Sequence, residues 1–329
     1  MEGNVPVLMG SAMKIAVLDN APLSDAYLDW SGIRQMGECS FYDRTLPEEI
    51  VARAEDCECV LVNKVVMGKA QIDCLPKLKY IGVMATGCNN VDLPYCRKRN
   101  IAVCNIPQYS TNSVAEATFA HLLNFATFTE TNSAAVKGGA WQNNPDFCFS
   151  KTPLEELAGK TIGLIGYGAI GKKVAKIAKA FDMKVLAYAP SKTPNTSDGT
   201  ADFASLDFLF KNADIISLHC PLCESNKEII NERTLALCKD GVWLVNTARG
   251  GLVDEKALAN ALNSGKVAFA GIDVLSAEPP KGGNVLLGAE NCRITGHTAW
   301  ATKQAKRRLL KIAEENLRMY LNNTPQNLV

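Results

Sequence analysis

The sequence lacks a run of apolar residues long enough to cross a membrane, and it lacks an excess of charge of either sign. Its 329 residues include 35 Lys and Arg against 34 Asp and Glu, which leaves a formal net charge of +1. This balance excludes a charge-driven binder of nucleic acid or of a membrane surface. The N-terminal residues 1–4 also lack the basic and apolar stretches of a signal peptide, so we expect a cytoplasmic protein.

Histidine is scarce, with only His121, His219 and His297 in the chain, and the 12 cysteines are scattered. Their spacing is not that of a small disulfide-bonded protein, so we expect reduced thiols. His219 is followed by Cys220 and Cys223, a spacing that invites a metal or redox hypothesis. A structural zinc needs four ligands, and no second Cys or His pair accompanies these three residues. The sequence therefore predicts no metal site.

Short apolar segments alternate with polar, helix-compatible segments along most of the chain. This alternation predicts an α/β protein with two doubly wound parallel sheets of the Rossmann kind. The expected strands are residues 14–18, 59–62, 80–83, 101–104, 161–165, 184–188, 215–218, 242–246 and 267–273.

Helices and chain breaks set the expected domain boundaries. Residues 1–12 are expected to be an extension outside the fold, and a long helix is expected from 110 to about 136. Glycines and an Asn-Pro pair break the helical period in residues 137–145, which we interpret as a connector between two units. The amphipathic segment 302–322 cannot bury its apolar stripe alone and should return to the first domain. The predicted domains are residues 13–110 with 302–329, and residues 111–301.

The strongest local signal is the glycine-rich motif of residues 166–171, Gly-Tyr-Gly-Ala-Ile-Gly, between an expected strand and an expected helix. In this context the motif predicts a dinucleotide site. Gly166 would allow the tight turn, Gly168 would let the backbone approach a pyrophosphate, and Gly171 would permit close packing of the helix.

The next strand does not end in the acidic residue that would complete the motif. Tyr188 is followed by Ala189, Pro190, Ser191 and Lys192. No carboxylate stands there to repel a 2′-phosphate, while Ser191 could donate a hydrogen bond and Lys192 could supply a positive charge. The sequence therefore leaves NADP and NAD both open, with a slight lean towards NADP.

Segments 85–92, 105–116, 246–251, 271–279 and 295–300 occur in order around the glycine motif of residues 166–171. Together these ordered segments resemble the D-isomer-specific 2-hydroxyacid dehydrogenase family, and the resemblance extends from Lys14 onward. Within that family, the sequence most resembles the branch of glycerate dehydrogenases and hydroxypyruvate reductases. Two positions depart from the usual pattern, namely Gly296, where a proline usually precedes the histidine, and Cys88, where an aromatic residue is common.

The resemblance implies a catalytic set of Arg249, Glu278 and His297 in a cleft between the two domains. Arg249 can form two hydrogen bonds to the carboxylate and keto oxygen of a 2-keto acid, which a lysine cannot reproduce. His297 would give a proton to the oxygen as hydride arrives, and Glu278 would support the imidazolium. The first domain would bind substrate through backbone N–H groups of Ala85, Thr86 and Gly87, and the second would bind the cofactor. The predicted cofactor contacts are Gly166, Gly168, Ala169, Ile170, Gly171, Ser191, Lys192, His219, Cys220, Pro221, Asn226, Thr247, Ala248, Asp273, His297 and Ala299.

The resulting hypothesis is an NAD(P)H-dependent reductase of hydroxypyruvate or glyoxylate that works reversibly as a homodimer, with residues 141–149 contributing to the dimer contact. It would have no nucleic-acid or membrane partner. One alternative is a corepressor-like protein that senses the dinucleotide, since such members keep the Arg, Glu and His. Another is a dehydrogenase of a larger acid, such as 3-phosphoglycerate, or of D-lactate. Phosphoglycerate would call for extra cations near Ala85–Gly87, and the sequence shows no Arg or Lys cluster there.

Overall fold

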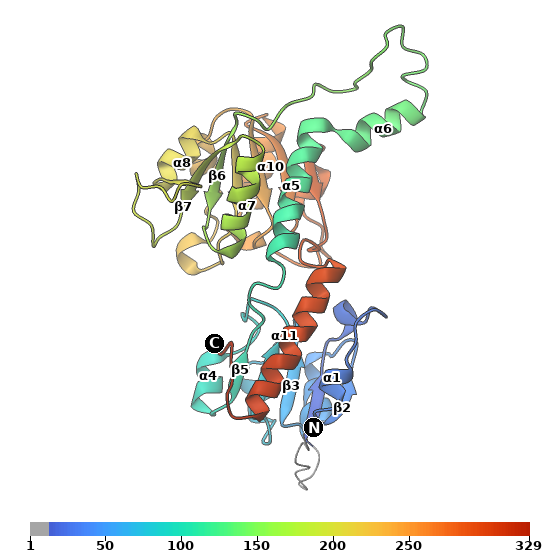
Figure 1. The fold of residues 1–329 in the computed structure, drawn as a ribbon, viewed down its shortest axis with the longest axis vertical. Helices are drawn as coiled ribbons and strands as arrows, with labels where there is room; N and C mark the ends of the chain where they lie inside the picture. The colour runs from blue at the N-terminus through green and yellow to red at the C-terminus, as the bar shows by residue number, and fades with distance from the viewer. Residues whose placement is uncertain (1–12) are drawn as a thin grey trace, which may run out of the picture. The chain divides into compact units, whose positions relative to one another are not determined.

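The computed structural model describes residues 13–329, and the expected extension 1–12 lies outside the described residues. The chain divides into two compact units (Figure 1). The first contains the described residues up to Ser110 together with Thr302–Val329, and the second contains Thr111–Ala301. The chain therefore passes from one unit to the other at Ser110, and residues 137–145 belong to the second unit. Our interpretation of that segment as a connector between the units was wrong.

The first unit is built on a five-stranded parallel sheet with the order β2-β1-β3-β4-β5. Its central strands are fully buried apolar runs, as expected for a sheet covered on both faces. The strands are β1 Lys14–Val17, β2 Glu38–Phe41, β3 Cys59–Val62, β4 Tyr80–Val83 and β5 Ala102–Cys104, and the helices are α1 Ser31–Arg34, α2 Ile50–Ala54, α3 Lys69–Asp73, α4 Leu93–Lys98 and α11 Lys303–Leu321.

Helix α11 supplies the final layer of the first unit. Its buried stripe includes Leu309, Leu310 and Leu317. Tyr320 near its end lies against Tyr80 of β4, with ring centroids 4.7 Å apart. The apolar stripe that could not be buried by the helix alone is therefore buried on the sheet of the first unit.

The second unit contains a seven-stranded parallel sheet with the order β12-β11-β10-β9-β6-β7-β8. The strand order reverses beside β6, and ligands of doubly wound sheets bind at such a point, outside the carboxyl ends of the strands. The strands are β6 Thr161–Ile165, β7 Lys184–Tyr188, β8 Asp202–Phe203, β9 Ile215–Leu218, β10 Val242–Asn246, β11 Val267–Ile272 and β12 Cys292–Ile294. The helices are α5 Thr111–Thr127, α6 Thr129–Lys137, α7 Ala169–Ala180, α8 Leu206–Asn212, α9 Glu232–Leu237 and α10 Glu255–Asn263.

The long helix expected from 110 to about 136 is two helices. Phe128, between α5 and α6, has a φ of 45°, in the left-handed region that interrupts an α-helix. Helix α5 is held on the sheet by Phe125, whose ring stacks on Phe269 at 5.2 Å. Helix α6 buries none of its residues and leads into a segment that extends away from the sheet of the second unit (Figure 1). The predicted helix was therefore correct in type but wrong in continuity.

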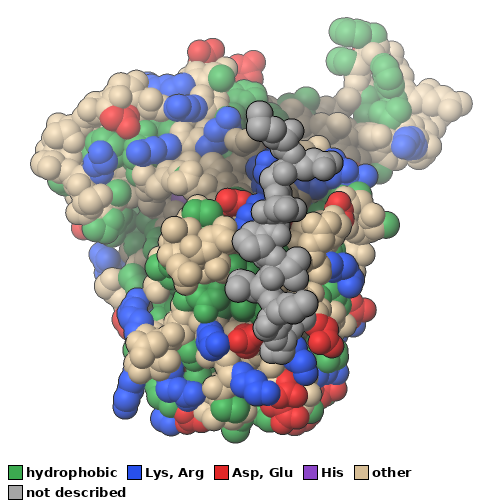
Figure 2. All heavy atoms as spheres, turned by 60° about the horizontal axis from the view of Figure 1, so that its bottom comes forward, with side chains coloured by type: hydrophobic (Ala, Val, Ile, Leu, Met, Phe, Trp, Pro, Cys, Tyr) green, Lys and Arg blue, Asp and Glu red, His purple; other side chains and the backbone are tan. Residues whose placement is uncertain are grey.

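Within residues 13–329, no helix is long and apolar enough to cross a membrane. Figure 2 shows basic and acidic side chains interspersed over the face that it draws. That distribution agrees with the net charge of +1.

Candidate active site and cofactor site

The glycine motif lies between β6 and α7 and forms a tight turn. Gly166 has a φ of +102°, and a Cβ there would stand 2.5 Å from the His219 carbonyl carbon. A Cβ on Gly171 would stand 2.3 Å from the Gly166 carbonyl oxygen. Both positions thus exclude larger residues, because the turn, the first turn of α7 and the end of β9 are in close contact.

Gly168 differs from its two neighbours in the motif. It precedes α7 as its N-cap, and a Cβ added there would meet no atom within 4 Å. Gly168 and Ala169 are exposed and Ile170 is half-buried, so the N-terminal backbone of α7 is open to a ligand. The N-terminus of a helix favours an anion, and this geometry fits the pyrophosphate of a dinucleotide.

The end of β7 would border the adenosine ribose. Ser191 and Lys192 are exposed, and the Lys192 N–H donates to the Ala189 carbonyl at 3.0 Å to close a turn. The Lys192 ammonium lies over the Phe203 ring, 5.1 Å from its centroid. Lys192 thus places a positive charge at this edge of the sheet. Its ammonium would have to move away from the Phe203 ring to reach a 2′-phosphate.

The segment after β9 continues the same edge. His219 Nε2 lies 2.9 Å from Ser217 Oγ, and burial lowers the pKa of His219 to about 3, so the imidazole is neutral. Asn226 donates to the Pro221 carbonyl at 2.7 Å and accepts from the Cys223 N–H at 2.8 Å. Burial raises the pKa of the Cys220 thiol to about 11. The side chains of His219, Cys220 and Asn226 are therefore uncharged at this edge of the sheet, and the Asn226 amide holds the turn through its two hydrogen bonds.

His297 and Glu278 are brought together by two different loops. His297 Nδ1 lies 2.6 Å from Glu278 Oε2, and the second carboxylate oxygen accepts the Leu275 N–H at 2.9 Å. A carboxylate can only accept, so Nδ1 carries the hydrogen of this bond and Nε2 is the atom that can exchange a proton with a substrate. Both side chains are partly exposed, at 27% and 34%.

Asp273, directly after β11, fixes the loop that carries His297. Its carboxylate is 2% exposed and accepts from the Thr298 and Ala299 N–H groups at 2.9 Å and from Thr295 Oγ1 at 2.5 Å. The Asp273 carbonyl accepts the His297 N–H at 2.8 Å. Asp273 was predicted to contact the cofactor, and that contact stays a prediction. Its described hydrogen bonds are with the backbone and the Thr295 hydroxyl of the histidine loop.

Arg249 lies in the loop after β10, and its Nη1 donates to the Ala248 carbonyl at 2.7 Å. Sequence reasoning missed Asn246, which shapes this loop. Asn246 is fully buried, accepts the Ala248 N–H at 3.0 Å and donates to the Arg249 carbonyl at 2.8 Å. Thr247, predicted to touch the cofactor, is buried with its hydroxyl 3.3 Å from that of Thr118. An asparagine at the end of a buried strand was the available signal for this role.

Glu255, in the first turn of α10, is a second residue that sequence reasoning missed. Its carboxylate accepts the Ser276 N–H at 2.8 Å, the Ser276 hydroxyl at 2.7 Å and the Asn284 amide at 2.8 Å. A Cβ on Gly250 would stand 2.0 Å from the Leu275 carbonyl carbon, so the Arg249 loop touches the loop that carries Glu278. The structure therefore places all three predicted catalytic residues on loops at the carboxyl edge of one sheet.

In the first unit, the predicted substrate loop follows β4. The Ala85 carbonyl accepts the Ile106 N–H at 3.0 Å, and Thr86 Oγ1 donates to the Ile106 carbonyl at 2.8 Å. Asn105 donates to the Thr86 carbonyl at 2.8 Å. These bonds tie the loop to the end of β5, so its backbone is held in one conformation.

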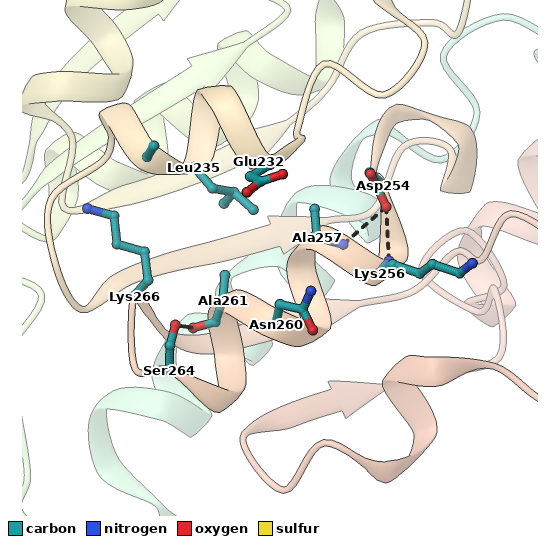
Figure 3. Close-up of a pocket in the computed structure, with 10 residues that line it drawn as sticks. Glu232, Leu235, Asp254, Lys256, Ala257, Asn260, Ala261, Ser264 and Lys266 are labelled. Atoms are coloured by element: carbon teal, nitrogen blue, oxygen red, sulfur yellow. Dashed lines mark hydrogen bonds between the residues drawn. The ribbon is translucent and has the colours of Figure 1, made fainter.

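A groove of about 690 Å³ lies elsewhere on the second unit (Figure 3). Leu235 and Ala261 contribute apolar surface, and the Asp254 carboxylate accepts from two N–H groups at the start of α10. Neither the glycine motif nor Arg249, Glu278 or His297 lines it. Its charged lining residues are Glu232, Asp254, Lys256 and Lys266, none of which the sequence predicted as a site residue.

The open glycine turn and the paired histidine define a class of protein, the dinucleotide-dependent oxidoreductases. A family model described as "D-isomer specific 2-hydroxyacid dehydrogenase, NAD binding domain" matches residues 119–299. The hydroxypyruvate reductase of Blautia hydrogenotrophica is 45% identical over 320 residues, which are 96% of this chain and 99% of the relative. The chain belongs to the D-isomer specific 2-hydroxyacid dehydrogenase family, and the resemblance drawn from the motifs is confirmed.

Solved structures agree with this assignment. An acyclic imino acid reductase in complex with NADPH and D-Arg has a TM-score of 0.84 at 31% identity and covers 96% of this chain and 100% of its own. A D-lactate dehydrogenase from Aquifex aeolicus, complexed with NAD and lactic acid, has a TM-score of 0.81 at 29% identity, covering 94% and 96%. The predicted fold class, with two Rossmann-like domains, is confirmed. The protein is an NAD(P)-dependent D-2-hydroxyacid dehydrogenase.

The contrast between Gly168 and Gly171 gives a test of the cofactor site. Gly168→Ala should leave the thermal midpoint unchanged, because the methyl group meets no atom, yet weaken NAD(P)H binding by about tenfold or more, because it occupies the path of the pyrophosphate. Gly171→Ala, the matched variant, should lower the thermal midpoint by several degrees. Calorimetry and fluorescence titration measure both. Unchanged cofactor affinity in Gly168→Ala would move the pyrophosphate away from this turn.

Proposed function

We propose that this dehydrogenase reduces hydroxypyruvate or glyoxylate to D-glycerate or glycolate and catalyses the reverse oxidation. The observation that carries the mechanism is the 2.6 Å hydrogen bond between His297 and Glu278, which sets the protonation pattern of the imidazole. The choice of substrate is supported by the 45% identity to a hydroxypyruvate reductase over nearly the whole chain.

Arg249 binds the substrate carboxylate and polarises its keto oxygen. The planar guanidinium can donate to both oxygens at once, and its positive charge stabilises the negative charge that develops on the keto oxygen. Asn246 positions the backbone from which the Arg249 side chain extends, since it accepts the Ala248 N–H and donates to the Arg249 carbonyl. The guanidinium keeps one contact with the Ala248 carbonyl, which leaves further N–H groups for a substrate.

His297 is the general acid of the reduction. Its Nε2 gives a proton to the keto oxygen of the substrate, and it takes that proton back in the oxidation. Glu278 keeps the hydrogen on Nδ1 and stabilises the imidazolium, so it acts as a positioning residue through His297. Asp273 accepts the backbone N–H groups of His297 and of the two residues that follow it, and so fixes the loop at the histidine.

The cofactor is held by the second unit, where the N-terminus of α7 and Gly168 accommodate the pyrophosphate. The bound nicotinamide supplies the hydride. Ser191 and Lys192 border the adenosine ribose, and the chain has no carboxylate at the end of β7 to exclude a 2′-phosphate. This composition supports acceptance of both NADPH and NADH.

The first unit contributes the backbone of Ala85, Thr86 and Gly87 to substrate binding in this proposal. The hydrogen bonds to Asn105 and Ile106 support it, because they fix the loop before any ligand arrives. The location of the substrate in a cleft between the two units stays a prediction.

We also propose that the enzyme is a homodimer built on the second unit. Exposed apolar side chains gather in the extended segment that begins with α6, including Trp141 at 47%, Phe147 at 91% and Leu154 at 56% exposure. A segment that buries so little of its own apolar surface is stabilised when a second copy covers it.

His297→Ala should lower kcat for hydroxypyruvate by a factor on the order of 10² to 10⁴, the usual contribution of a positioned acid. NADH binding, followed by fluorescence titration, should remain as in the wild type because Gly168 and α7 are unchanged. Steady-state kinetics with hydroxypyruvate and glyoxylate measure the effect and test the substrate assignment. Near wild-type turnover in the variant would remove His297 from the mechanism.

Ala189→Asp should shift cofactor preference towards NADH, since it places at the end of β7 a carboxylate that accepts from ribose hydroxyls and repels a 2′-phosphate. The wild type should use NADPH at least as well as NADH. The measurement is kcat/KM for both cofactors, with Thr193→Asp as a control that adds the same charge farther along the turn. A wild-type preference for NADH above about a hundredfold, roughly 2.7 kcal/mol, contradicts the argument.

Phe147→Asp should convert the dimer to monomers, because it places a charge on the most exposed of these apolar side chains. Phe208→Asp, at a 52% exposed phenylalanine on α8, is the matched control and should remain dimeric. Sedimentation velocity or light scattering gives the mass of each. A monomeric wild type, or a dimeric Phe147→Asp, argues against this interface.

A further inference from the structure

Lys64 lies next to the predicted substrate loop, in a segment that sequence reasoning passed over. Strands β3 and β4 pair with Val62 opposite Val83, and the Met84 N–H donates to the Val62 carbonyl at 2.7 Å. Asn63 continues the contact by donating from Nδ2 to the Met84 carbonyl at 3.2 Å. Neighbouring strands are about 4.8 Å apart, so this register brings the Lys64 backbone beside Ala85.

The backbone of Lys64 is held by a buried carboxylate. Asp19, two residues beyond β1, is 9% exposed and accepts the N–H groups of Asn63 at 2.6 Å, of Lys64, and of Val65 at 2.9 Å. Burial raises the pKa of Asp19, while the three N–H groups and the positive charge of Lys64 oppose that rise. Asp19 thus ties the end of β1 to three consecutive residues beyond β3.

A second clamp acts from the opposite side. Asn90 donates from Nδ2 to the Val65 carbonyl at 2.9 Å and to the Asn63 carbonyl at 3.4 Å. Asn63 and Val65 are buried, at 5% and 9% exposure, whereas the Lys64 side chain between them is exposed. The structure therefore fixes the backbone from which this exposed side chain extends, just beyond β3 at the carboxyl edge of the sheet.

An ammonium at this position can distinguish 2-keto acids by their third carbon. If Ala85, Thr86 and Gly87 hold the substrate carboxylate, as in the proposed function on which this inference rests, the rest of the substrate lies at the same edge. A lysine ammonium donates to a hydroxyl oxygen, whereas it gains nothing from a methyl group of the same size. Glyoxylate has no third carbon to offer.

We propose that Lys64 is a specificity-determining residue that donates to an oxygen on C3 of the substrate. Asp19 is then a positioning residue, because it acts on specificity only through the backbone of Lys64. The enzyme therefore prefers 2-keto acids that carry a C3 hydroxyl over those that carry a C3 methyl.

The test compares hydroxypyruvate with pyruvate, which differ by that single oxygen. In Lys64→Met the ratio of kcat/KM for hydroxypyruvate to that for pyruvate should fall by about tenfold or more, because a hydrogen bond from a charged donor is lost. Lys64→Arg should restore part of the ratio. Lys69→Met, an exposed lysine of the same unit paired with Asp73, is the matched control and should leave the ratio unchanged.

Asp19→Asn gives a second reading of the same proposal. The amide has only one acceptor atom, so it cannot keep all three N–H bonds, and the ratio should fall while NADH affinity, a property of the second unit, stays constant. If this variant does not fold, Lys64→Met still decides the matter, since its side chain is exposed.

The outcomes separate this inference from the proposed function. Failure of the wild type to reduce hydroxypyruvate or glyoxylate would overturn the proposed function and this inference together. A wild type that reduces them, with an active Lys64→Met variant whose ratio stays within about twofold, overturns the role of Lys64 alone.

Discussion

The carboxylate of Asp273 is the group on which the catalytic arrangement depends. It is buried at the end of β11 and accepts from three donors of the loop that carries His297. A buried carboxylate is tolerated only when hydrogen bonds satisfy it. If the loop moved away, the carboxylate would stay buried without its donors, which costs free energy, so the loop is held in place. Because that loop is fixed, the His297 imidazole lies within hydrogen-bond distance of Glu278. Glu278 belongs to a second loop, which is held by hydrogen bonds to Glu255.

The fold was predictable from the sequence wherever strands are buried on both sides. Strands β3, β4, β6, β9 and β10 begin and end at the predicted residues, since continuous apolar runs next to polar helices allow few other structures. Strand β2 was missed because its residues alternate between exposed and half-buried at an edge, and β8 because it has only two residues. The break at Phe128 escaped prediction because no glycine or proline marks it.

The site was predictable only in part. Glycine spacing predicted the tight turn before α7, since the geometry at Gly166 and Gly171 excludes side chains, and ordered motifs pointed to Arg249, Glu278 and His297. Their supporting residues, Asn246 and Glu255, escaped notice because they act on backbone groups of loops that no periodic pattern describes. A side chain that bonds to backbone across a loop leaves little local trace in the sequence.

Both units solve the same structural problem in the same way. The carboxyl edge of a parallel sheet leaves loops whose N–H groups have no neighbouring strand to pair with, yet chemistry requires those loops to be rigid. In each unit an aspartate within two residues of a strand end, Asp19 in the first and Asp273 in the second, is buried and accepts N–H groups of the loop that follows a neighbouring strand. The aspartates themselves are shielded, whereas Lys64 is exposed and His297 is half-buried, so these two side chains are accessible to solvent. Rigidity and reactivity are thereby assigned to different residues of one short segment.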